Sequence, residues 1–504
     1  MTSSALLVTA PLKPLLPRCC GTSVHAKAPW VLPMEHSAAN PAAGLTCAAW
    51  SCLRDSKIRH SQWFNQSDLL HIKRINDPDA ALGVAAGRKD ASFSCSNPSV
   101  ALWMDSGGYG RFAVAAQPIK TGDCALRATA FAVVARQPRQ RCHWCFAALK
   151  KKALQCGDCR FARYCSRECL EADQILHNEQ CQALRRLVER DNSSRMSQLD
   201  LETIRLGLAV LAMERLIGNT GVLRRLAVNN QSKKNGGNDV NEVVKIIVQE
   251  MPSVSVLHIQ QTLRMVQCNA HPMYLDGRTI CGVGVFPEAA MTLNHSCVPN
   301  VMPSFDPQTR TLSFHAIADI PKSHAIEYSY IDILQSRHRR QQMLQDGFGF
   351  QCICARCEEE KTDADDVGGD GGAEEKRVMG RLIEMEAAKM ITQTQLDGLY
   401  TAHRSFFERN HEAAFGFHML EVRHAQTRRD WLGVMTAAQK LIALWRSLGL
   451  PEVYPTMESL QWYVMVAATQ AGHADKASHA RECISNIHRI CGYKSGIDEA
   501  SIAG

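Results

Sequence analysis

A chain of 504 residues, of which 45% are apolar and 21% charged, has room for about three domains and suits a soluble protein with a sizeable core. Its formal net charge of +7 is spread too thinly to indicate nucleic-acid binding. No apolar run approaches the ~18 residues that cross a bilayer, so we expect no membrane association.

The first 97 residues differ in composition from the rest. Before Arg54 the only acidic residue is Glu35, Ser, Pro and Ala are in excess, and the apolar start at 5–8 is too short for a secretory signal. We expect a disordered extension, with an organelle transit peptide as the alternative. The 21 cysteines favour a reducing compartment, so we expect the cytoplasm, the nucleus or both.

Short apolar stretches separated by turn signals predict strands between residues 98 and 135. The segments 111–116 and 130–134 are two of these stretches, and Gly107-Gly108 and Thr121-Gly122-Asp123 are two of the turns. This part of the chain is therefore expected to be rich in β-structure.

Residues 142–181 carry eight metal-type side chains in four short pairs: Cys142 and Cys145, Cys156 and Cys159, Cys165 and Cys169, His177 and Cys181. Each pair has the short spacing with which two side chains bind one ion, and a tetrahedral zinc site takes two pairs. The run therefore predicts two zinc ions. A disulfide framework is the alternative, disfavoured because most other cysteines are unpaired in spacing.

From 197 to 217 the apolar residues recur at helical spacing, as Leu201, Ile204, Leu208, Leu211 and Leu216 show. A polar loop follows at 229–238. Residues 278–330 again predict short strands, with alternating apolar residues at 312–317.

Two further motifs lie in and beyond this region. Asn294-His-Ser-Cys-Val-Pro-Asn300 precedes Glu327-Tyr-Ser-Tyr-Ile-Asp332, and a Cys-x-Cys-x2-Cys cluster ends the region. Three thiolates require a fourth ligand for a closed tetrahedral site. Cys268, Cys281 and Cys297 are the nearest upstream candidates, and the residues alone do not choose among them.

An acidic, Gly-rich stretch at 358–375 predicts a flexible linker. Beyond it the pattern is helical, with Val378, Leu382, Met385 and Lys389 on one stripe and the same period at 431–448 and 457–469. Antiparallel helix pairs in a solenoid-like stack are the expected packing.

In their order, these motifs resemble the SET and MYND domain family of protein lysine methyltransferases, over residues 105–490. The resemblance implies an α+β multidomain fold in which a MYND zinc finger splits a β-rich SET domain. A Cys-rich post-SET segment and an all-helical, tetratricopeptide-like C-terminal domain follow. The implied ranges are 1–97 for the extension, 98–141 for the first SET part, 142–181 for the finger, 182–265 for a helical insertion, 266–335 for the SET core, 336–357 for the post-SET segment, 358–377 for the linker and 378–496 for the helical domain.

The resemblance also implies how the ligands group around three zinc ions. The first MYND ion takes Cys142, Cys145, Cys165 and Cys169, and the second takes Cys156, Cys159, His177 and Cys181. The third ion takes Cys297, Cys352, Cys354 and Cys357, which would tie the 294–300 segment to the post-SET loop. Structural zinc of this kind stabilises the fold directly.

The cofactor implied by the resemblance is S-adenosylmethionine. Its expected contacts are Gly108, Gly110, Arg111, Asn269, Asn294, His295 and Phe350. Tyr330 is the implied catalytic residue, whose hydroxyl would help to align a neutral lysine amine with the methyl group. Desolvation of the amine beside a sulfonium charge favours its neutral form.

Three positions depart from the family's pattern. Ser323-His324-Ala325 stands where members carry a Gly-Glu-Glu turn, and a serine at positive φ would be strained there. Phe348 stands where many members have a second tyrosine in the lysine channel, so a hydroxyl is missing. Phe112 replaces a frequent glycine.

Our leading hypothesis is a protein-lysine N-methyltransferase acting on a histone or another protein. The alternative is an inactive adaptor that binds partners through its finger and helical domain. Expected partners are a proline-rich peptide at the finger and a chaperone or other protein at the helical domain. We expect a monomer. Direct DNA binding is not expected, because the basic residues Lys150, Lys151, Lys152, Arg160, Arg163 and Arg167 lack base-reading helices beside them.

Overall fold

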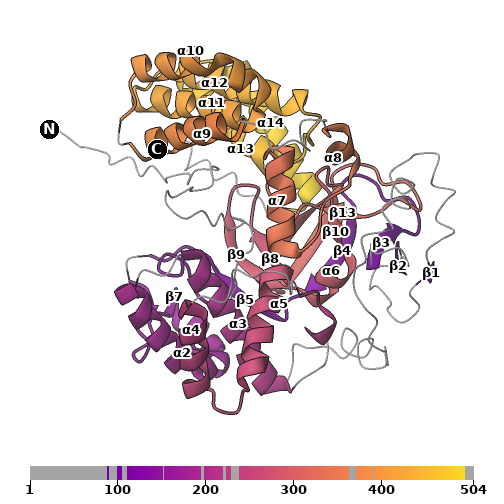
Figure 1. Cartoon of the computed structure of the whole chain (residues 1–504), viewed down its shortest axis with the longest axis vertical. Helices are drawn as coiled ribbons and strands as arrows, with labels where there is room; N and C mark the ends of the chain where they lie inside the picture. Colours follow the sequence, from indigo (N-terminus) through magenta and orange to yellow (C-terminus); the bar gives the residue numbers. More distant parts are fainter. Residues whose placement is uncertain are drawn as a thin grey trace.

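The computed structural model describes residues 88–89, 99–104, 111–150, 152–194, 198–218, 223–228, 238–361, 371–388 and 390–493. Figure 1 shows three regions in this part of the chain: a helical region at the top, small sheets in the middle, and a finger with long helices at the lower left. The predicted mixed fold class, with a helical C-terminal region, is confirmed.

The expected strands between 98 and 135 are present. They are β2 (Val100–Met104), β3 (Arg111–Ala115), β4 (Cys124–Thr129) and β5 (Ala132–Ala135), and β1 (Arg88–Lys89) pairs with β2. Within the predicted N-terminal extension, residues 1–97, the structure describes only Arg88 and Lys89.

The finger follows β5 and is built on a short hairpin and a helix. Strands β6 (Leu154–Gln155) and β7 (Arg163–Tyr164) pair antiparallel, and α2 (Arg167–Ser194) carries the last ligands of the run. The expected helix at 197–217 is α3 (Gln198–Ile217). A 3-10 turn (Leu223–Arg225) and α4 (Asn238–Glu250) come next, and the expected polar loop lies outside the described residues up to 237.

Helix α5 (Val256–Asn269) packs against α3, and Ser255 caps its N-terminus by accepting the backbone N–H of His258. The strands beyond it are β8 (Ala270–Tyr274), β9 (Ile280–Val285), β11 (Val301–Asp306) and β12 (Thr311–Ala316). In β12 every second residue is buried, as the alternating sequence predicts. Helix α6 (Pro287–Thr292) lies between β9 and β11.

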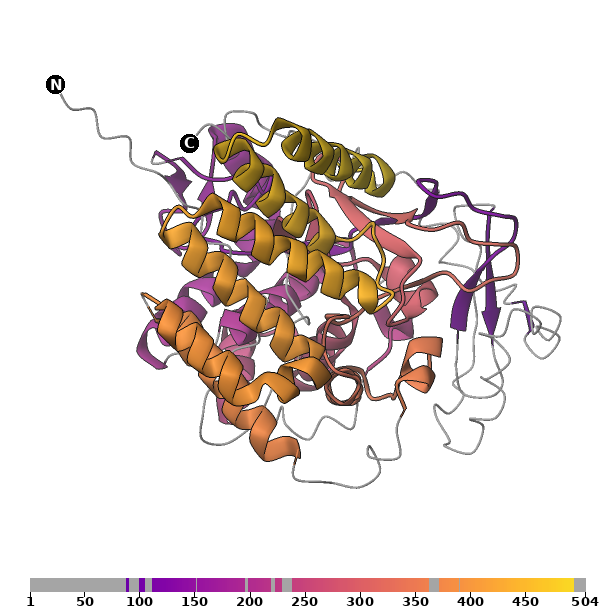
Figure 2. The ribbon, with the colours of Figure 1, turned by 90° about the horizontal axis from the view of Figure 1, so that it is seen from above.

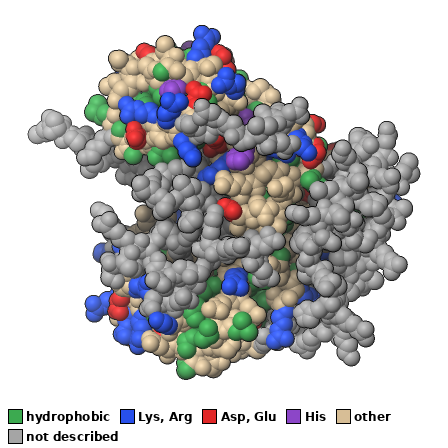
Figure 3. Space-filling model, in the orientation of Figure 1, with side chains coloured by type: hydrophobic (Ala, Val, Ile, Leu, Met, Phe, Trp, Pro, Cys, Tyr) green, Lys and Arg blue, Asp and Glu red, His purple; other side chains and the backbone are tan. Residues whose placement is uncertain are grey.

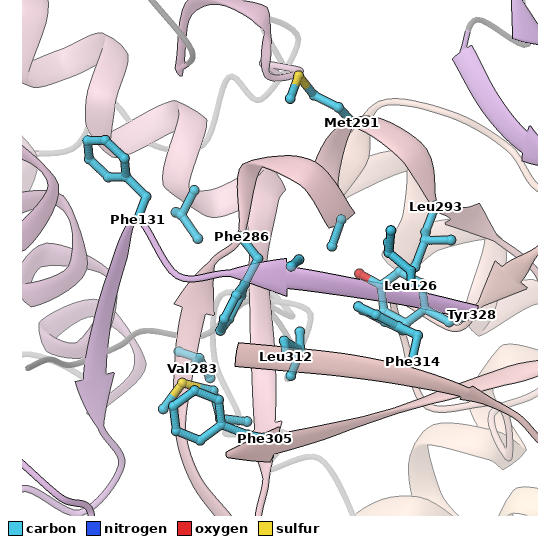
Figure 4. Close-up of a cluster of buried hydrophobic side chains, with 14 of the residues drawn as sticks. Leu126, Phe131, Val283, Phe286, Met291, Leu293, Phe305, Leu312, Phe314 and Tyr328 are labelled. Atoms are coloured by element: carbon cyan, nitrogen blue, oxygen red, sulfur yellow. The ribbon is translucent and has the colours of Figure 1, made fainter. Parts of the chain in front are cut away.

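Two three-stranded antiparallel sheets form the middle of the molecule, in the orders β5-β9-β8 and β11-β12-β4. Their apolar faces share one core, and Figure 4 shows the rings of Phe286, Phe305, Phe314 and Tyr328 within it. The rings of Phe314 and Tyr328 lie 5.2 Å apart between centroids. Strand β10 (Asn294–His295) pairs in parallel with β13 (Glu327–Tyr328), so this core holds the two site motifs side by side.

Helices α7 (Arg337–Phe348) and α8 (Ala355–Glu359) follow the sheets. The helical region then consists of α9 (Gly371–Ala387), α10 (Gln393–Arg409), α11 (His411–Thr427), α12 (Trp431–Ser447), α13 (Pro455–Gln470) and α14 (Ala474–Cys491). Figure 2 shows α11 to α14 running side by side, as the predicted stack requires. Helix α9 begins inside the stretch expected to be a linker, of which residues 362–370 lie outside the described part. Val378, Leu382 and Met385 are buried on its inner face, and Lys389 is not described.

The helical region meets the sheets at the β8–β9 turn. Arg278 in this turn donates to the buried carboxylate of Glu458 on α13 at 3.3 Å, and its guanidinium lies 3.6 Å from the ring of Trp462. Gly277 presses so closely on Glu458 that a β-carbon would collide with it. None of the described helices is long and apolar enough to cross a membrane.

Candidate active site and metal centres

The structure gathers the predicted metal ligands into three groups of four. In each group the ligand atoms lie within 4.8 Å of one another, and the membership is the predicted one. In the finger, the Sγ atoms of Cys145 and Cys165 are 3.5 Å apart, and Cys159 Sγ lies 3.6 Å from Nε2 of His177. Four sulfur atoms about 2.3 Å from a tetrahedral zinc ion would lie roughly 3.8 Å from one another, so the spacing fits zinc.

The finger pairs interleave as predicted, because the first and third pairs share one group and the second and fourth share the other. Burial lowers the pKa of His177 to about 4, which keeps the imidazole neutral, as a metal ligand must be. The described cysteines form no disulfide. The donor chemistry and the distances together support zinc binding.

The third group settles the choice of its fourth ligand. Cys297 Sγ lies 3.6 Å from Cys357 Sγ and 3.9 Å from Cys352 Sγ, and all four cysteines of the group are buried. The two other candidates face elsewhere: Cys268 donates to the carbonyl of Gly347, and Cys281 to that of Met273. We call the four residues Cys297, Cys352, Cys354 and Cys357 the third cluster.

Tyr330 lies beside the third cluster, among aromatic rings. The centroid of its ring is 4.9 Å from that of Phe348, 6.4 Å from that of Phe350 and 5.4 Å from that of His295. Its hydroxyl donates to the backbone carbonyl of Leu293 at 2.6 Å. Burial raises the pKa of Tyr330 above its ordinary value, and the charge of Glu327 adds to this effect. The phenol therefore stays protonated at neutral pH, and its oxygen keeps lone pairs that can accept a hydrogen bond.

The imidazole of His295 has partners on both sides. Its Nδ1 accepts the backbone N–H of Tyr330 at 3.0 Å, and its Nε2 faces Cys297 Sγ at 3.3 Å. Burial lowers the pKa of His295 to about 3, so the ring is neutral. With both nitrogens used inside the protein, His295 can meet a cofactor only through its backbone or its ring face.

The other residues expected to contact the cofactor differ in their hydrogen-bond partners and in whether the structure describes them. Asn294 donates to the backbone carbonyl of Arg111 at 3.1 Å, which brings β10 to the start of β3. Asn269 is buried, and its amide donates to the carbonyls of Ala227 and Met265, both at 2.7 Å. Gly108 and Gly110 lie outside the described residues.

The departures from the family's pattern are visible in the backbone. Ser323 has a φ of 70°, the left-handed conformation expected to strain a serine. The turn is held against β3, because Ser323 donates its N–H to Ala115 and the N–H of Ala115 donates to His324. Phe112 is buried in β3.

Two site residues were not predicted from the sequence. The carbonyl of Leu293 orients Tyr330, and Arg340, which is fully buried, donates from Nε to Cys297 Sγ at 3.2 Å and from Nη2 to Cys357 Sγ at 3.5 Å. Arg340 occurs in the sequence Arg337-His-Arg-Arg-Gln, and only the helical phase of α7 distinguishes it from its neighbours.

A basic depression lies on the finger. Figure 3 shows Lys and Arg side chains at the lower left of this face, the region in which Figure 1 places β7, α2 and α4. Its volume is about 520 Å³. It is lined by Arg139, Gln140, Ala148, Leu149, Lys150, Ala153, Gln155 and Arg163. Three cations, two glutamines and three apolar side chains thus share this lining.

Comparison with known proteins agrees with this arrangement. Residues 142–181 match the family model of the MYND finger. The chain is 25% identical over 272 residues to N-lysine methyltransferase SMYD2-B of Xenopus laevis, which covers 52% of this chain and 61% of that protein. It is 29% identical over 231 residues to histone-lysine N-methyltransferase ASHR1 of Arabidopsis thaliana, 43% of this chain and 46% of that protein.

A third relative is histone-lysine N-methyltransferase SMYD1 of Homo sapiens, 25% identical over 287 residues that cover 51% of this chain and 56% of that protein. The chain thus spans about half to three fifths of the length of these relatives. The finger and the relatives confirm the resemblance to the SET and MYND domain family.

Proposed function

We propose that this chain, similar to the SET and MYND domain proteins in its finger and over about half its length, is an S-adenosylmethionine-dependent protein-lysine N-methyltransferase. The observation that carries the proposal is the placement of Tyr330. Its hydroxyl is fixed on the Leu293 carbonyl, within an aromatic cluster formed by Tyr330, Phe348, Phe350 and His295.

Tyr330 acts by orientation and not as a base. The hydroxyl of Tyr330 donates its proton to the Leu293 carbonyl, and its pKa is raised. Its oxygen can therefore act only as a hydrogen-bond acceptor, and the hydrogen bond to Leu293 fixes its position. An acceptor of this kind can hold an amine N–H in a near-attack geometry, which accounts for a large part of the rate of a displacement. The missing hydroxyl at Phe348 leaves one fewer polar contact for the amine, and this would affect how many methyl groups are added.

The aromatic cluster supports the deprotonation of a lysine. A free lysine has a pKa near ~10.4, and removal of the ammonium from water disfavours the charged form. The ring of Phe348, whose centroid is 4.9 Å from that of Tyr330, would lie against the aliphatic stem of a lysine and exclude water. The substrate is therefore proposed to be a lysine of a histone or another protein.

S-adenosylmethionine, when bound, supplies a methyl group on a sulfonium. The described residues that would hold it are Asn294, with its amide anchored on Arg111, the backbone of His295, and the ring of Phe350. Together with the three zinc groups, these residues fit the cofactor set that the resemblance implies.

The finger and the helical region are the proposed docking sites for partners. The depression lined by Arg139, Lys150 and Arg163 supports binding of a peptide at the finger, and a proline-rich segment is the partner we propose there. A chaperone or another protein is proposed for the helical region. We propose a cytoplasmic or nuclear location, because thiolates that hold zinc fit a reducing compartment, and we propose that the protein acts as a monomer.

The test is to incubate the purified protein with methyl-labelled S-adenosylmethionine and a protein extract, beside Tyr330→Phe and a matched control, Tyr328→Phe. Tyr328 lies two residues away in the core, with its ring stacked on that of His271. We expect the Tyr330 variant to lose labelling by about 100-fold or more and the Tyr328 variant to retain most of it. Equal labelling in the wild type and the Tyr330 variant would remove Tyr330 from the reaction. No labelling and no cofactor binding would favour the adaptor hypothesis.

A further inference from the structure

A buried arginine, Arg340, lies against the third cluster, and every nitrogen of its guanidinium donates a hydrogen bond. In addition to the two thiol contacts, Arg340 donates from Nη1 to the carbonyl of Gln335 at 2.7 Å and from Nη2 to Glu360 at 2.6 Å. Glu360 also accepts from Arg356 at 2.7 Å. Every nitrogen of Arg340 therefore has an acceptor, although its side chain is fully buried.

The charge of a filled site explains why an arginine is found there. Four thiolates around a divalent ion leave an excess of two negative charges in a place that water does not reach. A guanidinium that donates to two of the thiolates offsets part of that charge and fixes both sulfur atoms in direction. The finger thiols differ in their side-chain partners, which include other thiols, a hydroxyl and an imidazole.

The third cluster is connected to Tyr330 through one ring. Because the backbone N–H of Tyr330 occupies Nδ1 of His295, the neutral ring carries its proton on Nε2, which points at Cys297 Sγ. Cys297 is the sulfur that also receives Nε of Arg340. The sequence of contacts is thus Arg340 to Cys297, Cys297 to His295 and His295 to Tyr330.

We propose that Arg340 and His295 are positioning residues that transmit the geometry of the third cluster to Tyr330. Arg340 sets the direction and charge of the Cys297 thiolate, and His295 holds the backbone of Tyr330 at a fixed place relative to that sulfur. The part of this inference that concerns methyl transfer rests on the proposed function, whereas the part that concerns the metal does not.

The metal arm of the test uses Arg340→Met, with Arg337→Met as its matched control. Arg337 lies one helical turn earlier and donates to the backbone carbonyl of Cys357 at 2.7 Å. The full-length proteins are loaded with cobalt, and the thiolate charge-transfer bands and the rate of metal loss to a chelator are recorded. We expect Arg340→Met to shift the bands and to release one ion at least ~10-fold faster, and Arg337→Met to match the wild type. Arg340→Lys keeps a charge but loses the fork, so it should fall between them.

The link to Tyr330 is tested by two substitutions of His295. Asn places a polar atom near the position of Nδ1, so His295→Asn can keep the Tyr330 contact and loses the one to Cys297. Gln reaches the position of Nε2, so His295→Gln keeps the contact to Cys297 and loses the one to Tyr330. We expect fast metal release only in the Asn variant, and a kcat that falls at least ~10-fold in both, with a smaller change in the KM for S-adenosylmethionine.

The inference is overturned if Arg340→Met and Arg337→Met have the same spectrum and release rate, or if the two His295 variants release metal equally. It is also overturned if the KM for the cofactor accounts for the whole loss of activity in both His295 variants. A wild type that transfers no methyl group, but in which the metal results hold, would instead contradict the proposed function and leave the link between Arg340 and Cys297 in place.

Discussion

The finger and the third cluster hold metal ligands in opposite ways. The finger takes all eight ligands from forty consecutive residues, and its Cys165 is exposed. The third cluster joins Cys297 to a loop 55 to 60 residues later, and all of its members are buried. A local site can form from spacing alone, whereas a site built from distant segments forms only when the sheets and α7 are in place. The geometry of the third cluster therefore depends on the folded core, and Tyr330, which contacts this cluster through His295, depends on it as well.

The largest expected effect comes from removing one ligand on each side of this comparison. Cys297→Ser should lose one ion and reduce methyl transfer by about 100-fold or more, because His295 and Tyr330 lose their anchor. Cys156→Ser, in the second finger group, should lose one ion and retain transfer within a few-fold. Metal content and initial rates measured on the same preparations decide between these outcomes. Equal losses of activity would show that the two regions are not different in this respect.

The next effect concerns the region around the third cluster, where the helical region contacts the start of α7. The buried Glu412 accepts the backbone N–H of Ser336 at 3.4 Å, and burial raises the pKa of this carboxyl from 4.5 to about 7. Between those values the folded protein holds a proton that the unfolded chain releases, so stability falls as the pH rises from about 4.5 to about 7 and then levels off.

Glu412→Gln removes that dependence. Its free energy of unfolding should exceed that of the wild type by up to about 3 kcal/mol at pH 8, and the difference should shrink as the pH falls toward 4.5. Urea unfolding of both proteins at several pH values measures the difference. A difference that is the same at every pH would contradict the shifted carboxyl.

A smaller effect is expected where the finger meets the core. Arg310, in the β11–β12 turn, donates to the carbonyl of Trp144 at 2.5 Å, and its guanidinium lies about 5 Å from the rings of Trp144 and Phe146. Burial lowers the pKa of Arg310 to about 9. Arg310→Met should cost about 2 kcal/mol of stability and leave the affinity for S-adenosylmethionine unchanged. Denaturant unfolding and calorimetric titration of the cofactor test both halves. A lower affinity for the cofactor in this variant would mean that the finger and the candidate active site are coupled.

The smallest effect concerns the strained turn that stands in for the family's glycine. Ser323→Gly should stabilise the protein by about 0.5 to 1 kcal/mol, because glycine adopts a φ of 70° without steric cost. Ser323→Ala is the control, since it removes the hydroxyl and keeps the strain. Thermal unfolding of the three proteins is sufficient. If the glycine variant is no more stable than the alanine variant, the turn is not strained.

How far the sequence predicts this molecule depends on how local each feature is. The finger ligands and the helix at 198–217 follow from spacing along the chain, and both are found where they were expected. The fourth ligand of the third cluster could not be chosen from the residues alone, because Cys268, Cys281 and Cys297 are equivalent until the sheets bring one of them to the loop. The resemblance supplied that choice, and also the positive φ at Ser323.

Arg340 shows the limit of such reasoning. Arginines at 337, 339 and 340 are indistinguishable by composition, and one turn of α7 decides which of them is buried against the thiols. The contacts of the His295 ring with Tyr330 and Cys297 likewise depend on the pairing of β10 with β13, which no local sequence pattern predicts. Whether a charged side chain is buried depends on the tertiary structure, and the local sequence shows only that the charged residue is present.

The most direct test of the difference between the two regions is a stepwise removal of metal. A chelator is added to the wild-type protein, released zinc is followed with a dye, and methyl transfer is sampled at each equivalent lost. We predict that the first ions leave from the finger, where Cys165 is exposed, with most activity retained, and that activity falls when the ion of the buried third cluster is released. A loss of activity in proportion to the first ion released would contradict the account.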